Sequence, residues 1–168
     1  MKRRLIASLA IALMLVATLS LPAVAATEVP VTASVTVGEF ISITLAGSIG
    51  FGSVTPPAND RGTTGQIDGS PAISVNVAGE TNVNVDIGIK GVLATGSLLL
   101  PNWKYSKNFT DVTKTSIPEA YGATAVYPNA VPGSSNPFYH WITVPAGTAS
   151  GTHTITVSYK AVKTGTPL

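Results

Sequence analysis

Only two histidines in the sequence offer a general base near neutral pH, and the chain has no cysteine nucleophile. His140 lies in the aromatic segment 138–141, and His153 precedes an alternating apolar segment in phase with Ile155. We predict that both are packed or strand-end side chains. No hydrolase, zinc-protease or phosphate-binding motif occurs, and no spacing brings two carboxylates together. The sequence therefore predicts no enzyme, no catalytic residue and no cofactor.

One acidic segment offers oxygen ligands. Asn59, Asp60 and Asp68 lie within the segment 59–69, and such side chains suit calcium. Their spacing matches no defined calcium loop, and Asn, Asp and Gly are ordinary turn residues. We favour a turn without a metal, with calcium as the weaker alternative.

Two features concern carbohydrate. Asn108 begins the sequence Asn-Phe-Thr, a candidate N-glycan acceptor in an exported protein, and an unmodified loop is the equal alternative. Trp103, Tyr105 and Trp141 would stack on sugars if they were exposed. Core or edge-covering aromatic residues are the more frequent case, and we favour that interpretation.

The N-terminus has the organisation of an export signal. Residues 2–4 are basic, residues 5–21 form an apolar run of 17 residues, and a proline follows this run. Small residues then include Ala23 and Ala25, which suits cleavage after Ala25 or Ala26. The alternative is a retained helix, as in type IV pilins, but the run is short for a membrane span of about 20 residues. We predict that residues 1–26 are a cleaved signal peptide and that the mature chain is secreted.

Charge and length limit the class of the mature chain. The full chain has 10 basic and 8 acidic residues, and removal of the three basic residues at positions 2–4 changes the net charge from +2 to −1. Such a sparse charge predicts no nucleic-acid partner and no membrane partner after signal removal, and it permits self-association. The remaining 142 residues suffice for one core without disulfides, since cysteine is absent.

The patterning predicts an all-β protein: one antiparallel sandwich, jelly-roll or Ig-like, over residues 38–168. Apolar residues alternate with polar ones in five segments: 27–37, 41–45, 73–77, 83–89 and 155–161. We expect 73–77 and 83–89 to form a hairpin, and segment 138–144 to pair with 155–161. Long loops are expected over 55–71 and 127–137.

The first of these segments raises a question of pairing. From Val29 to Leu45 the odd positions are apolar except Glu39, and one continuous strand of these 17 residues would be roughly 56 Å long. Typical strands measure only about 17–20 Å. Either Gly38 and Glu39 make a turn that keeps both halves in the domain, or residues 27–37 project and pair elsewhere.

Several stretches resemble a known family. "VPVTASVTV", "SIGFGSVTPP", "TNVNVDIGIKG" and "WITVPAGTASGTHTITVSYKA" resemble small secreted archaeal β-sandwich proteins that form bundling pili. That group is similar to the bacterial TasA-like biofilm matrix fibre proteins. The resemblance implies a jelly-roll-like sandwich whose N-terminal strand inserts into the next subunit. The donor side chains would be Val29, Val31, Ala33, Val35 and Val37.

The chain departs from the bacterial members in being shorter and in lacking their helical insertions. The metalloprotease activity sometimes attributed to their relatives has no metal-binding motif here. We therefore expect a structural subunit of an extracellular or cell-surface filament, a head-to-tail homopolymer supporting adhesion or a biofilm. Neighbouring filaments or surface glycans are further candidate partners. The alternative is a monomeric carbohydrate-binding or surface-layer-associated module.

Overall fold

The computed structural model describes residues 32–168, and the chain divides into two units, residues 1–37 and 38–168. The predicted signal peptide, with Ala25 and Ala26, and the donor residues Val29 and Val31 lie outside the described residues. Residues 32–37 form neither helix nor strand, and the side chains of Val35 and Val37 are 88% and 76% exposed.

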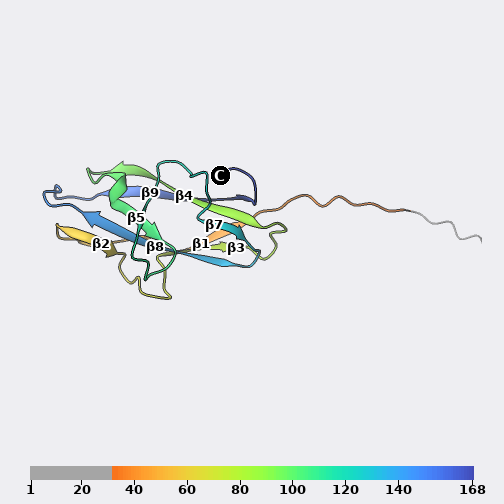
Figure 1. Ribbon diagram of the computed structural model, residues 1–168, viewed down its shortest axis with the longest axis horizontal. Coiled ribbons are helices and arrows are strands. Elements are labelled where there is room, and N and C mark those ends of the chain that lie inside the picture. The colour runs from red at the N-terminus through yellow and green to blue at the C-terminus, as the bar shows by residue number, and fades with distance from the viewer. Residues whose placement is uncertain (1–31) are drawn as a thin grey trace, which may run out of the picture. The chain divides into compact units, whose positions relative to one another are not determined.

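The second unit is an antiparallel β-sandwich, which confirms the predicted fold class (Figure 1). The larger sheet has the order β1-β3-β8-β5-β6, with β2 also paired to β8, and the smaller sheet has the order β7-β4-β9. The strands are β1 (Ile43–Gly47), β2 (Ala58–Gly62), β3 (Ile73–Val77), β4 (Val85–Thr95), β5 (Trp103–Ser106), β6 (Thr115–Ser116), β7 (Tyr127–Ala130), β8 (Ser135–Val144) and β9 (Thr154–Lys163). One 3-10 helix, η1 (Leu100–Asn102), precedes β5.

The core lies between the two sheets and is built from the alternating positions that the sequence shows. On β3 and on residues 85–91 of β4 every second residue is buried, because these positions face the opposite sheet. Phe138 of β8 lies at the centre, with the rings of Tyr127 and Tyr159 packed against it at centroid distances of 5.2 and 4.9 Å. The predicted inward faces of segments 73–77 and 83–89 are therefore correct.

The predicted hairpin of segments 73–77 and 83–89 is wrong, because β3 and β4 belong to different sheets. The residues between them turn toward the start of the unit and not back across a hairpin. Asn82 donates its amide to the carbonyl of Gly38 at 2.8 Å, and its Oδ1 accepts the N–H of Phe40. Thr81 exchanges hydrogen bonds with Ser42. These bonds pair polar groups of the connection between β3 and β4 and hold residues 38–42 beside that connection.

The second predicted pairing is also wrong. Segment 138–144 lies in β8, but β9 pairs with β4 over ten residues, from Val85 opposite Lys163 to Thr95 opposite Thr154. The connection 145–153 therefore crosses from one sheet to the other. The predicted loops contain strands as well, since β2 lies within 55–71 and β7 within 127–137.

Asp86 on β4 holds three chain segments together. Its carboxylate accepts hydrogen bonds from the N–H of Asn129 at 2.8 Å, the hydroxyl of Thr164 at 3.1 Å and the N–H of Gly165 at 3.2 Å. The Asn129 N–H is the main reason that the pKa of Asp86 lies below its usual value. This residue ties the ends of β7 and β9 to β4.

Asp86→Ala is expected to lower the free energy of unfolding by about 1–2 kcal/mol, because it leaves these donors with water as their only partner. Chemical denaturation followed by tryptophan fluorescence measures the change. Asp68→Ala, at an exposed carboxylate, is the matched control and should change stability by less than about 0.5 kcal/mol. Equal losses in the two variants would contradict this role for Asp86.

Candidate functional site: an apolar groove beside strand β9

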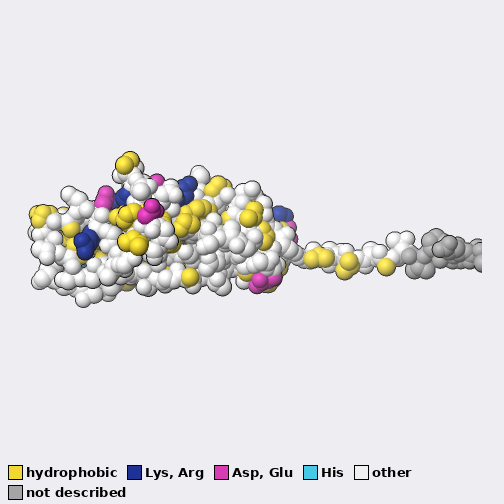
Figure 2. Space-filling model, turned by 90° about the horizontal axis from the view of Figure 1, so that it is seen from below, with side chains coloured by type: hydrophobic (Ala, Val, Ile, Leu, Met, Phe, Trp, Pro, Cys, Tyr) yellow, Lys and Arg dark blue, Asp and Glu magenta, His cyan; other side chains and the backbone are white. Residues whose placement is uncertain are grey.

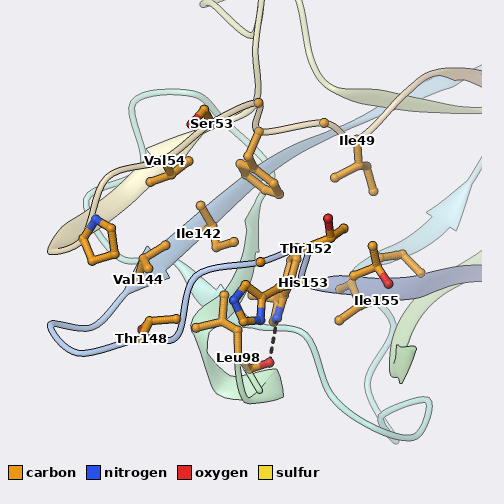
Figure 3. A pocket seen from close by; sticks show the side chains of 18 of the residues that line it. Ile49, Ser53, Val54, Leu98, Ile142, Val144, Thr148, Thr152, His153 and Ile155 are labelled. Atoms are coloured by element: carbon orange, nitrogen blue, oxygen red, sulfur yellow. Dashed lines mark hydrogen bonds between the residues drawn. The ribbon is translucent and has the colours of Figure 1, made fainter. Parts of the chain in front are cut away.

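A groove of about 800 Å³ opens between the two sheets along the first half of β9 (Figure 3). One wall is the irregular segment 49–56, which follows β1, and the other is the connection 148–153 with the start of β9. Ile142 and Val144 of β8 lie between these walls. Other apolar lining residues are Leu45, Phe51, Ile73, Leu98 and Trp103.

The groove exposes side chains that belong to the core. Ile155, Val157 and Tyr159 point from β9 toward the other sheet but are only half-buried, whereas Ile87 and Ile89 on the neighbouring β4 are fully buried. The reason is position, because β9 is an edge strand and pairs with β4 alone among the described strands. Leu45 on the opposite edge strand, β1, is 54% exposed. An edge of this length with apolar side chains is a template for another strand.

The lining carries no Lys, Arg, Asp or Glu, and its titratable side chains are His153 and Tyr159. The N–H of Ser97 donates to Nδ1 of His153 at 3.1 Å, and Nε2 of His153 donates to the carbonyl of Ala149 at 3.0 Å. Gly96 has φ +93°, and a Cβ there would lie 2.3 Å from the His153 ring. His153 therefore fastens the 145–153 connection to the 96–97 turn and shapes the groove.

His140 confirms the prediction of a packed side chain, since it is 1% exposed. Its Nε2 lies 2.7 Å from the hydroxyl of Tyr159, which fixes that ring at the inner end of the groove. Burial lowers the pKa of His140 to about 3 and raises that of Tyr159. The imidazole is therefore neutral at pH 7 and enclosed in the core.

The candidate calcium ligands lie on a strand and in the loop that follows it. Asn59 and Asp60 lie on β2, and Asp68 lies in the following loop. Asp60 accepts a hydrogen bond from Nζ of Lys104 at 2.7 Å, and this bond is the main reason that its pKa is lowered. Within residues 32–168 no three His, Asp or Glu side chains are grouped so that they could hold a metal.

Asn108 lies exposed in a turn after β5. Its backbone N–H and its side-chain amide both donate to the Asp111 carboxylate, at 3.0 and 3.1 Å. The acceptor position is thus on the surface, and glycosylation remains a prediction.

The tryptophans do not present exposed faces to a sugar. Trp103 and Trp141 are 5% and 8% exposed. Trp141 is covered by Phe109 at a ring centroid distance of 5.4 Å and by Lys114 Nζ at 4.3 Å, and its Nε1 donates to Ser106 Oγ. Both residues match the core interpretation that we favoured.

The groove was not visible in the sequence, because its walls are two segments that read as irregular loops. The apolar residues Ile49, Phe51 and Val54 within a Gly/Ser-rich stretch were the available signal. Phe51 packs on Trp103 at 5.8 Å, so this segment is anchored to the core.

No protein-family model matches the chain, and no curated protein or solved structure matches it. In the described part of the chain no helix is both long and apolar enough to span a membrane.

Proposed function

We propose that this chain is the secreted subunit of an extracellular filament, built by donation of residues 27–37 from one copy into the groove of the next. The observation that carries the proposal is the apolar groove beside the edge of β9 with which no described strand pairs. Such a site binds an extended peptide through main-chain hydrogen bonds to the edge and alternate side chains in the groove. The groove lining and the tail match in chemistry: the lining is apolar and uncharged, one face of the tail is apolar, and the tail has no charged residue from Pro30 to Val37.

The length and the charge of the tail both suit the groove and the β9 edge. Eleven extended residues span roughly 36 Å, close to the roughly 33 Å of the β9 edge, and the groove covers the part of this edge from Thr154 to Tyr159. Burial of a valine side chain contributes about 1.5 kcal/mol, so the two valines that a strand paired along Thr154 to Tyr159 places in the groove contribute roughly 3 kcal/mol before main-chain pairing. Figure 2 shows Lys, Arg, Asp and Glu side chains spread over the visible face without a large patch of one sign, so little charge opposes close approach of copies.

Donor and acceptor are different surfaces of the same chain, and a heterologous contact of this kind does not close on itself but propagates. Filament growth therefore follows from strand donation without a further interface. A role in adhesion or a biofilm matrix, with neighbouring filaments or surface glycans as partners, belongs to the same proposal.

A monomeric surface module that binds a small carbohydrate is the second candidate. A volume of about 800 Å³ is typical of small-ligand sites. The groove has hydroxyl groups on one wall, from Thr148, Ser150 and Thr152. Its main weakness is that both tryptophans are buried.

Negative-stain electron microscopy of the mature chain, beside the same chain without residues 27–37, tests the proposal. Filaments are expected from the complete mature chain and folded monomers from the shortened one, because the deletion lies outside the sandwich unit. A cooperative thermal transition of the shortened chain is the control for folding. Monodisperse particles in both samples would reject the filament and lead to a glycan-binding screen.

A further inference from the structure

The two ends of β9 have different neighbours. Lys163, its last residue, pairs with Glu39, so the chain enters the sandwich unit at this end of the strand (Figure 1). The groove lies along the other half, from Thr154 to Tyr159. The point from which the tail departs and the groove are therefore separated along one strand of roughly 33 Å.

This arrangement sets the direction of a donated strand. In a head-to-tail filament the Lys163 end of the acceptor is where its own tail leaves, so the donor copy lies beyond the Thr154 end. Its strand then enters with Val37 nearest that end and its earlier residues farther along β9. Such a strand runs antiparallel to β9, whereas a chain that folded its own tail back from Gly38 would run parallel.

Resting on the proposed function, we propose that the groove takes the tail of a second copy antiparallel to β9, with Val37 opposite Ile155 and Ala33 opposite Tyr159. The smaller sheet then continues in antiparallel order as β7-β4-β9-donor. Side chains on the same face of such a pair lie directly opposite each other, so the register decides which sizes meet.

The size of Tyr159 selects this register. It is the largest inward side chain of β9 at the groove. Its ring packs against the ring of Phe138 at a centroid distance of 4.9 Å, and its hydroxyl lies 2.7 Å from Nε2 of His140. Ala33 is the smallest apolar residue of the tail and is the one that leaves room for this ring. A parallel strand with the same tail side chains facing inward would place Val35 against Tyr159 and Val37 against Ala161. The larger tail side chain would then meet the largest inward side chain of β9.

Paired cysteines test the direction, and the chain offers a clean background because it has no cysteine. Directly opposite residues of paired strands have the Cα separation that a disulfide requires. The solvent-facing positions Thr36 and Thr32 of the tail and Thr156 and Lys160 of β9 give four double variants of the mature chain. The antiparallel register predicts disulfides for T36C/T156C and T32C/K160C, and the parallel register predicts them for T36C/K160C and T32C/T156C.

After mild oxidation, non-reducing SDS gels should show a ladder of covalent oligomers for the first two variants, several-fold stronger than for the second two. S34C/S158C lies opposite in both directions and is the control for pairing with β9. Electron microscopy of each variant under reducing conditions shows whether filaments form without the disulfide.

Each other result overturns the inference in a defined way. Ladders from T36C/K160C and T32C/T156C would show a parallel donor, and cross-linked monomers would show that each chain fills its own groove. Filaments without a ladder from any of the five variants would exclude pairing with β9 and leave the filament function standing. Neither filaments nor ladders would reject the proposed function as well.

Discussion

A mature chain with Val35→Asp is expected to stay monomeric under conditions in which the unaltered chain forms filaments. Val35 is 88% exposed and lies outside the sandwich unit, so the substitution leaves the fold of that unit unchanged. In a groove without any basic lining residue, the carboxylate would be buried without a partner, at a cost of several kcal/mol. Each 1.4 kcal/mol weakens association tenfold, so we expect a loss of at least about a thousandfold.

Light scattering and negative-stain microscopy measure this loss. Thr36→Asp is the matched control, because it introduces the same charge one residue along, on the face of the tail that points away from the groove. It should form filaments close to those of the unaltered chain. Equal polymerisation of the two variants would contradict the assignment of Val35 to the buried face.

The complementary change on the acceptor side is Val157→Asp, which places the charge on the groove face of β9. This variant retains an intact tail, and the Val35→Asp variant retains an intact groove. Each should be monomeric alone, and their mixture should give a heterodimer that grows no further, because the only competent tail has filled the only competent groove. Size-exclusion chromatography with light scattering detects this species, and its formation also shows that the Val157→Asp chain has a functional tail.

The inward faces of the alternating segments were predictable from the sequence, but the partners of these strands, and the strands β2 and β7 within the predicted loops, were not. Alternation in 73–77, 83–89 and 155–161 reports which side of each strand meets an apolar layer. It does not report which sheet the strand joins, because both sheets face the same core. The hairpin prediction followed adjacency in the chain, whereas Thr81 and Asn82 bind residues 38–42 and carry the chain across to the other sheet. No local pattern encodes such a long-range partner.

The acceptor site was even less accessible to sequence reasoning. The tail is a continuous segment with one visible period, so a donor could be suggested from residues 27–37. The groove is assembled from β1, segment 49–56, β8 and β9, which are up to about 110 residues apart in the chain. Its defining property is that no other strand within residues 32–168 lies on the outer side of β9, and only the pairing of the whole sandwich reveals that.

The buried histidine predicts that the sandwich loses stability in mildly acidic solution. The pKa of His140 is about 3 in the folded chain and near 6.5 in the unfolded chain, so below pH 6.5 the unfolded state binds a proton that the folded state does not. The free energy of unfolding should then fall by about 1.4 kcal/mol per pH unit, or roughly 2 kcal/mol between pH 6.5 and pH 5. The pKa values of Asp60, Asp86 and Asp111 are lowered in the folded chain, so these carboxylates reduce the free energy of unfolding only below about pH 4. Above that pH they are ionised in both the folded and the unfolded chain.

Urea denaturation of the monomeric Val35→Asp chain at pH 7, 6 and 5 measures this slope. His140→Gln in the same background should be less stable at pH 7, because it alters a buried contact with Tyr159, but its stability should change much less toward pH 5. His153→Gln, at the partly buried histidine of the 145–153 connection, is the control: it removes the hydrogen bonds of His153 but should keep the slope that His140 causes. An unchanged slope in the His140→Gln chain would show that the acid sensitivity has another origin. In the folded chain the pKa of about 3 keeps His140 neutral at pH 5, so its contact with Tyr159 at the groove persists, and the loss of stability comes from protonation of the unfolded chain alone.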